Sequence, residues 1–390
     1  MTLRTSIKDR LFRATNTAFK RLYAFSRPFH RSSEDIAIIR TDNLGDLIIF
    51  AGCLPAYRQL YQGKKLVLFV SDAGKEFAEA VLGANDLVDQ VVAFDRERFS
   101  RDPFYFVYIS IKHLMHPYAI AVNTVSSRRT YVDVLMNIIN ARRKIGTSGD
   151  YSNADKDILD KRAFIYDQLI STGEMRHELD KNRRLISELA GTEIQTKVNW
   201  LEDYIPSGNG RTLIPEQKER RYCVIFPGGA KVWRRWPARR FAEIAVRLEQ
   251  AGIAAVICGN PPDQEACREV LAFSAGSIDA TSKLTIIDLA MVLRDSLFYF
   301  GNDTGIAHLA MAVGTKTVCV LGLGHFGRFF PYPDRARSAA VFDRHAACMG
   351  DNWACIQGRT DRPAPCIESV TSEDAWKLLA GMIQCSDSRS

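Results

Sequence analysis

The sequence YFGNDTGIAHLAMAVGTKTVCVLG, residues 299–322, is the most informative part of the chain for its architecture. It reads as an apolar strand, a polar corner (NDTG), a short helix carrying His308, and a second apolar strand. Asp or Thr at such a corner is a common helix cap. The corner suits an anion equally well, because a helix start offers unpaired backbone N–H groups and glycine lets a phosphate approach the backbone. Other parts of the chain must decide between the cap and the anion site.

The same alternation of strands and helices extends over most of the chain. Apolar runs that predict buried strands occupy residues 36–40, 65–70, 90–95, 118–124, 222–227 and 254–259. Nearly continuous apolar strands separated by amphipathic helices indicate parallel sheets that are covered on both faces. We therefore predict an α/β protein with two Rossmann-like, doubly wound domains. Ligands of such domains bind at the carboxyl ends of the strands, so we expect a cleft there.

A length of 390 residues exceeds what one hydrophobic core usually spans, which favours two domains. A helical pattern at 155–190 closes the first half, and a Pro-, Gly- and charge-rich stretch follows it. The predicted parts are a basic amphipathic segment (1–34), an N-terminal domain (35–198), a linker (199–221), a C-terminal domain (222–370), and a final helix and tail (371–390).

The net charge of +7 is unevenly distributed. Residues 1–31 carry eight Lys or Arg and a single Asp, and on a helix their apolar residues share one face. This pattern is typical of a segment that lies on an anionic membrane surface, although a solvated helix packed on its own domain has the same pattern. We find no apolar run long enough to span a membrane and no secretion signal. The expected location is the cytoplasm, at the inner face of the inner membrane.

Six of the nine cysteines lie in or near apolar or helical stretches, as reduced, mostly buried thiols do. They are Cys53, Cys223, Cys258, Cys267, Cys319 and Cys385. The other three, Cys348, Cys355 and Cys366, form a looser group without the paired CxxC spacing of a zinc site. Their role stays open between a metal site, a disulfide and free thiols.

Two further corners resemble the one at 302–305. In RTDNLGDLIIFAGCLP, residues 40–55, Asp46 stands at the start of the helix that follows the first strand. Its carboxylate can cap that helix or act as a general base, and these roles compete, because a carboxylate held by N–H donors is a weaker base. From this corner alone the cap is the better interpretation.

The other corner is FPGGAKVWRRWPARRF, residues 226–241, which follows a predicted strand. Its glycines give access to the backbone, and its cations can neutralise a diphosphate without a metal. The candidate residues here are Gly229, Lys231, Arg234 and Arg235. Binding of nucleic acid by Arg and Trp is a weaker interpretation, since the cluster is short and follows a buried strand. The corners carry no complete dinucleotide or P-loop fingerprint, so we predict neither of those sites.

Four stretches in this order resemble glycosyltransferase family 9, the lipopolysaccharide heptosyltransferases and their relatives, which have the GT-B fold. They are IIRTDNLGDLIIFAGCLPAYRQL, MRHELDKNRRLISEL, FPGGAKVWRRWPARRFAEIAVRLEQAG and GNDTGIAHLAMAVGTKTVCVLG. The resemblance implies that Asp46 is the catalytic base. It also implies that Asp303, Thr304, Gly305 and His308 form a corner that binds the donor diphosphate. Where the family usually has a lysine before Trp-Pro, this chain has Arg234. A planar guanidinium with several N–H donors thus takes the place of a compact ammonium group.

The resemblance implies an inverting transfer of a sugar, with ADP-heptose as the leading donor, to a hydroxyl of a lipopolysaccharide core or related surface glycan. It implies no cofactor, no catalytic metal and no nucleic-acid partner. The acceptor would lie on the N-terminal domain, for which Asn43, Lys112, His113 and Arg128 are candidates, with His116 and Arg129 nearby. Solvated loop charge is the competing explanation for each cation.

Four other functions remain open at this point. The first two are a family 9 transferase that uses another nucleotide sugar and one that modifies a protein or another glycan. The third is a sugar-nucleotide epimerase of the same fold, which rearranges the donor without an acceptor. The fourth is a binder of nucleotide sugars without catalytic activity, which the intact Asp46 and His308 argue against.

Overall fold

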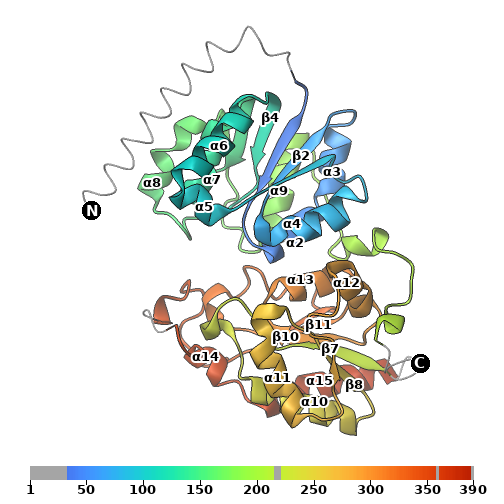
Figure 1. Cartoon of the computed structure of the whole chain (residues 1–390). Coiled ribbons are helices and arrows are strands. Elements are labelled where there is room, and N and C mark those ends of the chain that lie inside the picture. Colours follow the sequence, from blue (N-terminus) through green and yellow to red (C-terminus); the bar gives the residue numbers. More distant parts are fainter. Residues whose placement is uncertain (1–32, 215–220, 357–359, 388–390) are drawn as a thin grey trace. The chain divides into compact units, whose positions relative to one another are not determined.

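The computed structural model describes residues 33–214, 221–356 and 360–387 (Figure 1). The predicted basic segment therefore lies almost entirely outside the described residues. The chain divides into two compact units. Unit 1 comprises Met1–Met175 and Asp180–Gln195, and unit 2 comprises Arg176–Leu179 and Thr196–Ser390. We describe each unit by itself.

Unit 1 is built on a six-stranded parallel sheet in the order β3-β2-β1-β4-β5-β6. The strands are β1 (Ile36–Arg40), β2 (Leu66–Ser71), β3 (Gln90–Phe94), β4 (Tyr118–Asn123), β5 (Ala141–Thr147) and β6 (Gln168–Ile170). Its helices are α2 (Leu44–Ala51), α3 (Leu54–Leu60), α4 (Asp72–Phe77), η2 (Ala78–Gly83), α5 (Arg96–Arg101), α6 (Pro103–Leu114), α7 (Thr130–Ile138), α8 (Lys156–Asp160), η3 (Ala163–Ile165) and most of α9 (Glu178–Ala190).

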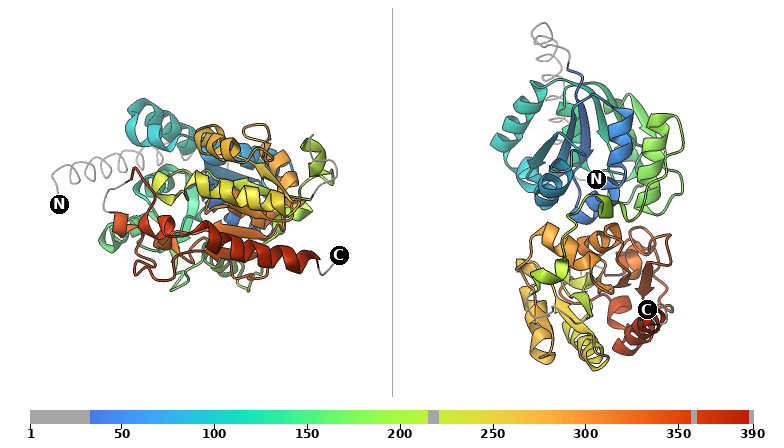
Figure 2. Two further views of the ribbon diagram at one scale, coloured as in Figure 1. Left: turned by 90° about the horizontal axis from the view of Figure 1, so that it is seen from below. Right: turned by 90° about the vertical axis from the view of Figure 1, so that its right-hand side faces the viewer.

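Helices cover both faces of this sheet, as its apolar strands require. In both views α5 and α6 lie on one face, and α3 lies on the other (Figures 1 and 2). Every residue of β1 and β2 is buried. The four strands predicted in this half are confirmed. The predicted helical stretch at 155–190 is wrong in its middle, because β6 interrupts it. Strand β5 was not predicted, because its first residues, ARRK, are charged and partly exposed.

Unit 2 repeats this architecture with the sheet order β12-β11-β10-β7-β8-β9. The strands are β7 (Tyr222–Phe226), β8 (Ala254–Ile257), β9 (Ile278–Asp279), β10 (Tyr299–Asn302), β11 (Thr317–Val320) and β12 (Ser338–Val341). Its helices are η4 (Trp200–Asp203), η5 (Gly210–Leu213), η7 (Val232–Arg234), α10 (Ala238–Gln250), η8 (Pro261–Asp263), α11 (Gln264–Phe273), α12 (Ile286–Arg294), α13 (Gly305–Ala312), η9 (Leu323–His325), η10 (Ala354–Ile356), α14 (Pro365–Glu368) and α15 (Ser372–Asp387).

One face of the second sheet carries α10, α11 and α15, and the other carries α12 and α13 (Figure 1). The aromatic core under α10 contains Trp236, Phe241 and Phe300, whose rings lie 4.8–5.8 Å apart. The described part of the predicted linker packs onto this unit. Leu201 of η4 is fully buried, and a Cβ on Gly210 would lie 2.4 Å from the backbone of Met291 in α12.

Each sheet has the doubly wound order 3-2-1-4-5-6, so the predicted fold class is confirmed. The direction of winding reverses between β1 and β4 in unit 1 and between β7 and β10 in unit 2. Side chains and loops at the carboxyl ends of these strand pairs occupy the place where ligands bind in such sheets. Residues 41–46 follow β1, residues 227–235 follow β7, and residues 303–305 follow β10.

None of the helices in the described part of the chain combines the length and the apolar character needed to cross a bilayer. Cys53, Cys223, Cys258, Cys267 and Cys319 are buried and free, as predicted.

Candidate functional site

The loop after β7 and the corner after β10 meet in unit 2, and Asn302 joins them. Its side-chain N–H groups donate to the carbonyl oxygens of Pro227 and Gly228, both at 2.9 Å, and its Oδ1 accepts from the Trp236 N–H at 2.9 Å. A Cβ on Gly229 would lie 3.6 Å from Cγ2 of Thr304. Two segments about 70 residues apart in sequence therefore form one surface at the winding reversal.

Asp263 fixes the shape of the loop after β7. Its Oδ1 accepts the Gly229 N–H at 3.0 Å, and a Cβ at position 228 would lie 2.2 Å from its Cγ, so only glycine fits there. Arg235 donates to the Gly229 carbonyl oxygen, and its Nη2 lies 3.9 Å from Oδ1 of Asp263. Gly229 and Arg235, both predicted to bind the donor, thus also build the loop. Lys231 is exposed, and its ammonium lies 5.4 Å from the ring centre of Trp233.

Arg234 and Asp303 form the charged centre of this site. The guanidinium donates to Oδ2 of Asp303 at 3.2 Å, and the carboxylate side chain is only 9% exposed. Burial raises the pKa of Asp303, while Arg234 acts in the opposite direction. The guanidinium also lies over the ring of Trp353, 5.3 Å from its centre. Arg234 is therefore held in place before any ligand binds.

His308 is buried beside this pair. Its Nδ1 lies 3.1 Å from the hydroxyl of Tyr332, and its Nε2 lies 3.7 Å from Oδ1 of Asp303. Burial lowers the pKa of His308 to about 3, and the positive charge of Arg234 adds to this effect. The imidazole is therefore neutral at neutral pH and contributes a hydrogen-bonding group, whereas Arg234 contributes the charge.

The start of α13 completes the corner. Thr304 is the N-cap residue, with extended backbone at φ −135° and ψ 174°, and its Oγ1 lies 3.4 Å from the Tyr299 hydroxyl. The eight-residue helix begins at Gly305 with no acidic residue in its first turn. Helix starts present N–H groups and a partial positive charge, so this corner can take a phosphate oxygen.

The predicted base, Asp46, lies in unit 1 in the first turn of α2. Its Oδ2 accepts the Asn43 N–H at 3.3 Å in a capping-box arrangement, so the predicted cap is present. Its Oδ1 also lies 3.7 Å from Nη2 of Arg40. Arg40 is 1% exposed and is itself held by the Thr124 carbonyl oxygen at 2.7 Å and by Asp42 at 3.0 Å. The carboxylate is thus oriented by a backbone donor and by a buried cation.

The residues predicted to bind the acceptor divide into two groups. Asn43 and Lys112 are exposed. His113 and Arg128 are 3% and 1% exposed, so their predicted place on a basic surface is wrong. The ring of His113 packs against Phe69 at 4.8 Å in the core. Arg128 forms a salt bridge of 2.9 Å with Asp133, which is also buried.

The buried His113 predicts a stability effect. Burial, with help from Lys112 and His116, lowers its pKa to about 4 from 6.5. Between pH 6.5 and pH 4 the unfolded chain binds a proton at this histidine and the folded chain does not. The free energy of unfolding therefore falls by about 1.4 kcal/mol for each pH unit of acidification in this range. His113→Phe is expected to lose less stability than wild type between pH 7 and pH 4.5 in urea unfolding. The exposed His345→Phe is the control, and equal acid sensitivity of wild type and His113→Phe would refute the effect.

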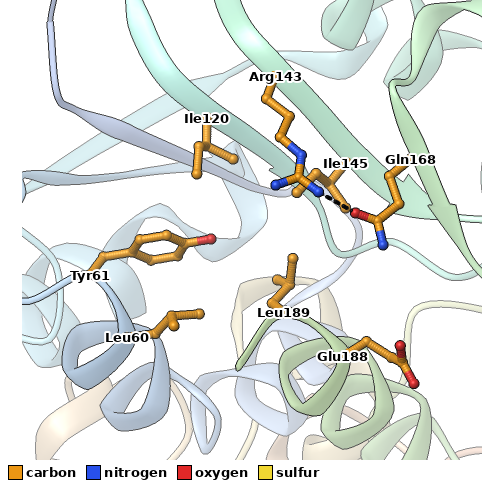
Figure 3. A pocket seen from close by; sticks show the side chains of 8 residues that line it. All are labelled: Leu60, Tyr61, Ile120, Arg143, Ile145, Gln168, Glu188 and Leu189. Atoms are coloured by element: carbon orange, nitrogen blue, oxygen red, sulfur yellow. Dashed lines mark hydrogen bonds between the residues drawn. The ribbon is translucent and has the colours of Figure 1, made fainter. Parts of the chain in front are cut away.

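A cavity of about 240 Å³ lies elsewhere in unit 1, over the face of the sheet between α3 and α9 (Figure 3). Arg143 donates to Gln168 at 2.6 Å in its wall. Gln168 begins β6, so the cavity lies toward the amino ends of the strands. Asp46 follows the carboxyl end of β1, and we assign the cavity no part in the site.

The sequence matches the family model of "Glycosyltransferase family 9 (heptosyltransferase)" over residues 131–353, more than half of the chain. The chain belongs to glycosyltransferase family 9. Lipopolysaccharide heptosyltransferase 1 of Escherichia coli (strain K12) is 22% identical over 160 residues, which cover 41% of this chain and 49% of that relative. Lipopolysaccharide heptosyltransferase 3 of Escherichia coli is 24% identical over 198 residues, covering 49% and 56%. The aligned part thus spans about half the length of these curated relatives.

Solved structures share the fold over nearly the whole chain. Escherichia coli heptosyltransferase WaaC with ADP-2-deoxy-2-fluoro heptose has a TM-score of 0.66 at 16% identity, covering 89% of this chain and 99% of that one. The glycosyl transferase family 9 structure from Veillonella parvula DSM 2008 has a TM-score of 0.67 at 17% identity, covering 91% and 98%. The fold of this family 9 chain is that of the heptosyltransferases.

Four residues that shape these corners escaped the sequence analysis. They are Arg40, Asp263, Tyr332 and Trp353. Arg40 carried a signal, because a charged residue that closes an otherwise apolar buried strand needs nearby partners. The other three residues carried no such signal. They follow β8, β11 and β12, far from the corners in sequence, and only the folded chain brings them close.

Proposed function

We propose that this family 9 chain transfers a sugar, most specifically heptose from ADP-heptose, to a hydroxyl of a lipopolysaccharide core or related surface glycan. The observation that carries the proposal is the corner of unit 2, where Arg234, Thr304 and the start of α13 come together at a winding reversal. A cation, a hydroxyl and helix N–H groups are the groups that stabilise a diphosphate. The similarity to lipopolysaccharide heptosyltransferases and the ADP-sugar in the WaaC structure support the choice of donor.

In the proposed reaction, Asp46 takes the proton of the acceptor hydroxyl as that oxygen attacks the anomeric carbon. The bond from this carbon to the diphosphate oxygen breaks in the same step, and the configuration inverts. The leaving nucleoside diphosphate gathers negative charge, which Arg234, Lys231 and the donors around Thr304 stabilise. We propose that these groups replace the divalent ion that many enzymes use for a diphosphate.

Donor binding tests this proposal directly. We expect an ADP-sugar to raise the melting temperature of the wild type more than UDP-, GDP- or dTDP-sugars do, because ligands of the folded state stabilise it. Asp46→Ala should keep the shift and Thr304→Ala should reduce it. A preference for another nucleotide would rule out ADP-heptose, and the absence of any shift would leave residues 302–305 as a helix cap.

A membrane-bound acceptor is supported by the exposed face of α6. Its apolar residues at spacings of three and four lie on one side of the helix, opposite the buried Ile109 and His113. Exposure reaches 86% for Phe104 and 62% for Met115. A helix with apolar residues on all sides needs a partner, and large exposed apolar patches mark contact surfaces. The members of the α6 face are Phe104, Val107, Tyr108, Ile111 and Met115.

We propose an anionic lipid surface as the partner of the α6 face. Residues 96–116 contain four Arg or Lys and two acidic residues. Nε2 of His116, just beyond α6, lies 3.1 Å from Oδ2 of Asp35, so the start of the described chain lies close to the end of this helix. Aromatic and apolar side chains beside basic charge are the composition that binds such surfaces.

Vesicle binding tests this part of the proposal. Replacing both Phe104 and Ile111 with glutamate is expected to weaken co-sedimentation with phosphatidylglycerol vesicles by about tenfold or more, because two apolar anchors are lost and two negative charges added. Phe273→Glu is the control, since Phe273 is 55% exposed on α11 of unit 2. Equal binding by the double variant and the control would exclude the α6 face as the membrane contact.

A further inference from the structure

Trp353 of unit 2 contacts both the Arg234 cation and the segment after β11. The guanidinium carbon of Arg234 lies over the indole, 5.3 Å from the ring centre. A Cβ at Gly322 or Gly324 would lie 2.3 Å or 2.6 Å from atoms of the same indole. These distances are well below carbon–carbon contact, so only glycine at both positions leaves room for the ring. The segment after β11 is thus shaped to receive Trp353.

The loop that carries the indole is fixed on this segment. We call residues 350–353 the indole loop. Trp353 has a φ of 66°, a left-handed conformation that a bulky residue adopts only where its surroundings impose it. Nε2 of His325 lies 2.7 Å from Oδ1 of Asn352, and the rings of His325 and Trp353 lie 5.9 Å apart. Two backbone hydrogen bonds add to this contact, from the Gly350 N–H to the Leu323 carbonyl oxygen at 2.9 Å and from the Asn352 N–H to that of Gly324 at 3.1 Å.

The guanidinium of Arg234 can make two contacts at the same time. Its Nη2 donates to Oδ2 of Asp303 at 3.2 Å. Its Nε and Nη1 donate to no protein acceptor in the part of the chain that the structure describes, and the side chain is 29% exposed. These N–H groups can therefore donate to the oxygens of a diphosphate while the charge of Asp303 stays paired.

The orientation of the guanidinium decides whether both contacts form. An arginine side chain has several rotatable bonds, and ordering them when a ligand binds costs conformational entropy. A flat aromatic ring against the guanidinium restricts its plane before the ligand arrives. A lysine at position 234 would carry its charge on a single nitrogen, which would have to serve Asp303 and the ligand together. The indole loop is therefore suited to an arginine.

We propose that Trp353 is a positioning residue for the donor diphosphate. Its ring sets the plane of the Arg234 guanidinium, so that Nη2 stays on Asp303 while Nε and Nη1 donate to the diphosphate. The indole acts through Arg234 and forms no bond to the donor. This inference rests on the proposed function, because it requires a diphosphate at the corner of unit 2.

A double-mutant cycle on ADP binding, measured by titration calorimetry, tests this role. Trp353→Leu should weaken ADP binding about tenfold, the scale of one well-placed cation–aromatic contact. Trp353→Phe retains an aromatic face and should stay within about threefold of wild type. When residue 234 is already alanine, Trp353→Leu should cause no further loss. An equal loss in both backgrounds, or no loss in either, would overturn the proposal.

Lysine at position 234 tests whether the plane of the cation matters. In the Arg234→Lys background, Trp353→Leu should weaken ADP binding by no more than about threefold, because an ammonium group has no plane to align. A loss as large as with arginine would show that the ring supports the charge alone, and it would also overturn the proposal.

Gly324→Ala displaces the indole without changing it, and it remains decisive if Trp353→Leu fails to fold. The added methyl group would lie 2.6 Å from the ring, so the ring must leave its place against Arg234. ADP binding should weaken about tenfold in this variant, and Gly324→Ala should add nothing to Arg234→Ala. Unchanged ADP binding by Gly324→Ala that unfolds cooperatively in urea would exclude the positioning role.

Trp376→Leu is the matched control, since Arg247 of α10 lies over Trp376 of α15, 5.7 Å from its ring centre. This variant removes the same kind of contact from unit 2 and should leave ADP binding unchanged. A loss as large as that of Trp353→Leu would overturn the assignment.

The same titrations separate this inference from the proposed function. Wild type that binds neither ADP nor ADP-heptose would refute the proposed donor and this inference with it. ADP binding by the wild type without coupling between Trp353 and Arg234 would overturn the inference alone.

Discussion

Asp46→Asn is expected to lower kcat by roughly 10²- to 10⁴-fold, the usual contribution of a positioned general base. The amide cannot take the acceptor proton. Its oxygen can still accept the Asn43 N–H that Asp46 accepts at 3.3 Å, so the cap of α2 is preserved. Donor affinity should stay the same, because the donor groups lie in unit 2. The measurement is steady-state kinetics alongside calorimetric donor binding.

Asp72→Asn is the matched control for this effect. Asp72 is the exposed first residue of α4 and follows β2 as Asp46 follows β1 within the same sheet. Its replacement should leave kcat unchanged. If Asp46→Asn instead keeps kcat within about threefold of wild type, general-base catalysis on the scale cited above is excluded and the residue is a helix cap only.

Arg234→Ala should weaken donor binding by roughly 10- to 100-fold, since a hydrogen bond to a charged group contributes about 1.5–3 kcal/mol. It also leaves the largely buried Asp303 without its 3.2 Å partner, so the variant should be less stable by about 1–3 kcal/mol. Titration calorimetry with ADP and ADP-sugars measures the first effect, and urea unfolding measures the second.

Two further variants separate ligand binding from folding. In Arg234→Ala with Asp303→Asn, the uncompensated carboxylate is gone, so stability should recover while donor binding stays weak. Arg234→Lys keeps the positive charge but loses the planar guanidinium, and it should bind the donor more tightly than Arg234→Ala does. Recovery of donor binding in the double variant would show that Arg234 acts only by balancing Asp303.

The sequence was sufficient for the fold class because apolar strands and helix starts are local signals. β1, β2, β7 and β10 are fully buried, and their apolar runs end at Gly- or Asp-containing corners. β6, β9 and β12 are two to four residues long and lie toward the sheet edges, where a short run has no detectable period. The interruption of the predicted helix at 155–190 by β6 has this cause.

Candidate site residues could be located from the sequence where they lie within a few residues of a strand end, as Asp46, Arg234 and Thr304 do. Prediction failed for charged residues that the sequence suggests are exposed but that the fold buries. Arg128 reads as a loop cation in the sequence, but it is buried in a salt bridge with Asp133, five residues away. Trp353 lies about 120 residues from Arg234, and only the packing of residues 348–356 against unit 2 brings them together.

Following ADP-heptose by NMR, with and without a lipopolysaccharide-core acceptor, tests whether the enzyme transfers heptose by an inverting reaction. We predict that ADP appears only when the acceptor is present, together with a glycoside of inverted anomeric configuration, and that Asp46→Asn forms neither. Conversion of the sugar nucleotide into another sugar nucleotide without acceptor would indicate an epimerase and contradict the proposed transfer.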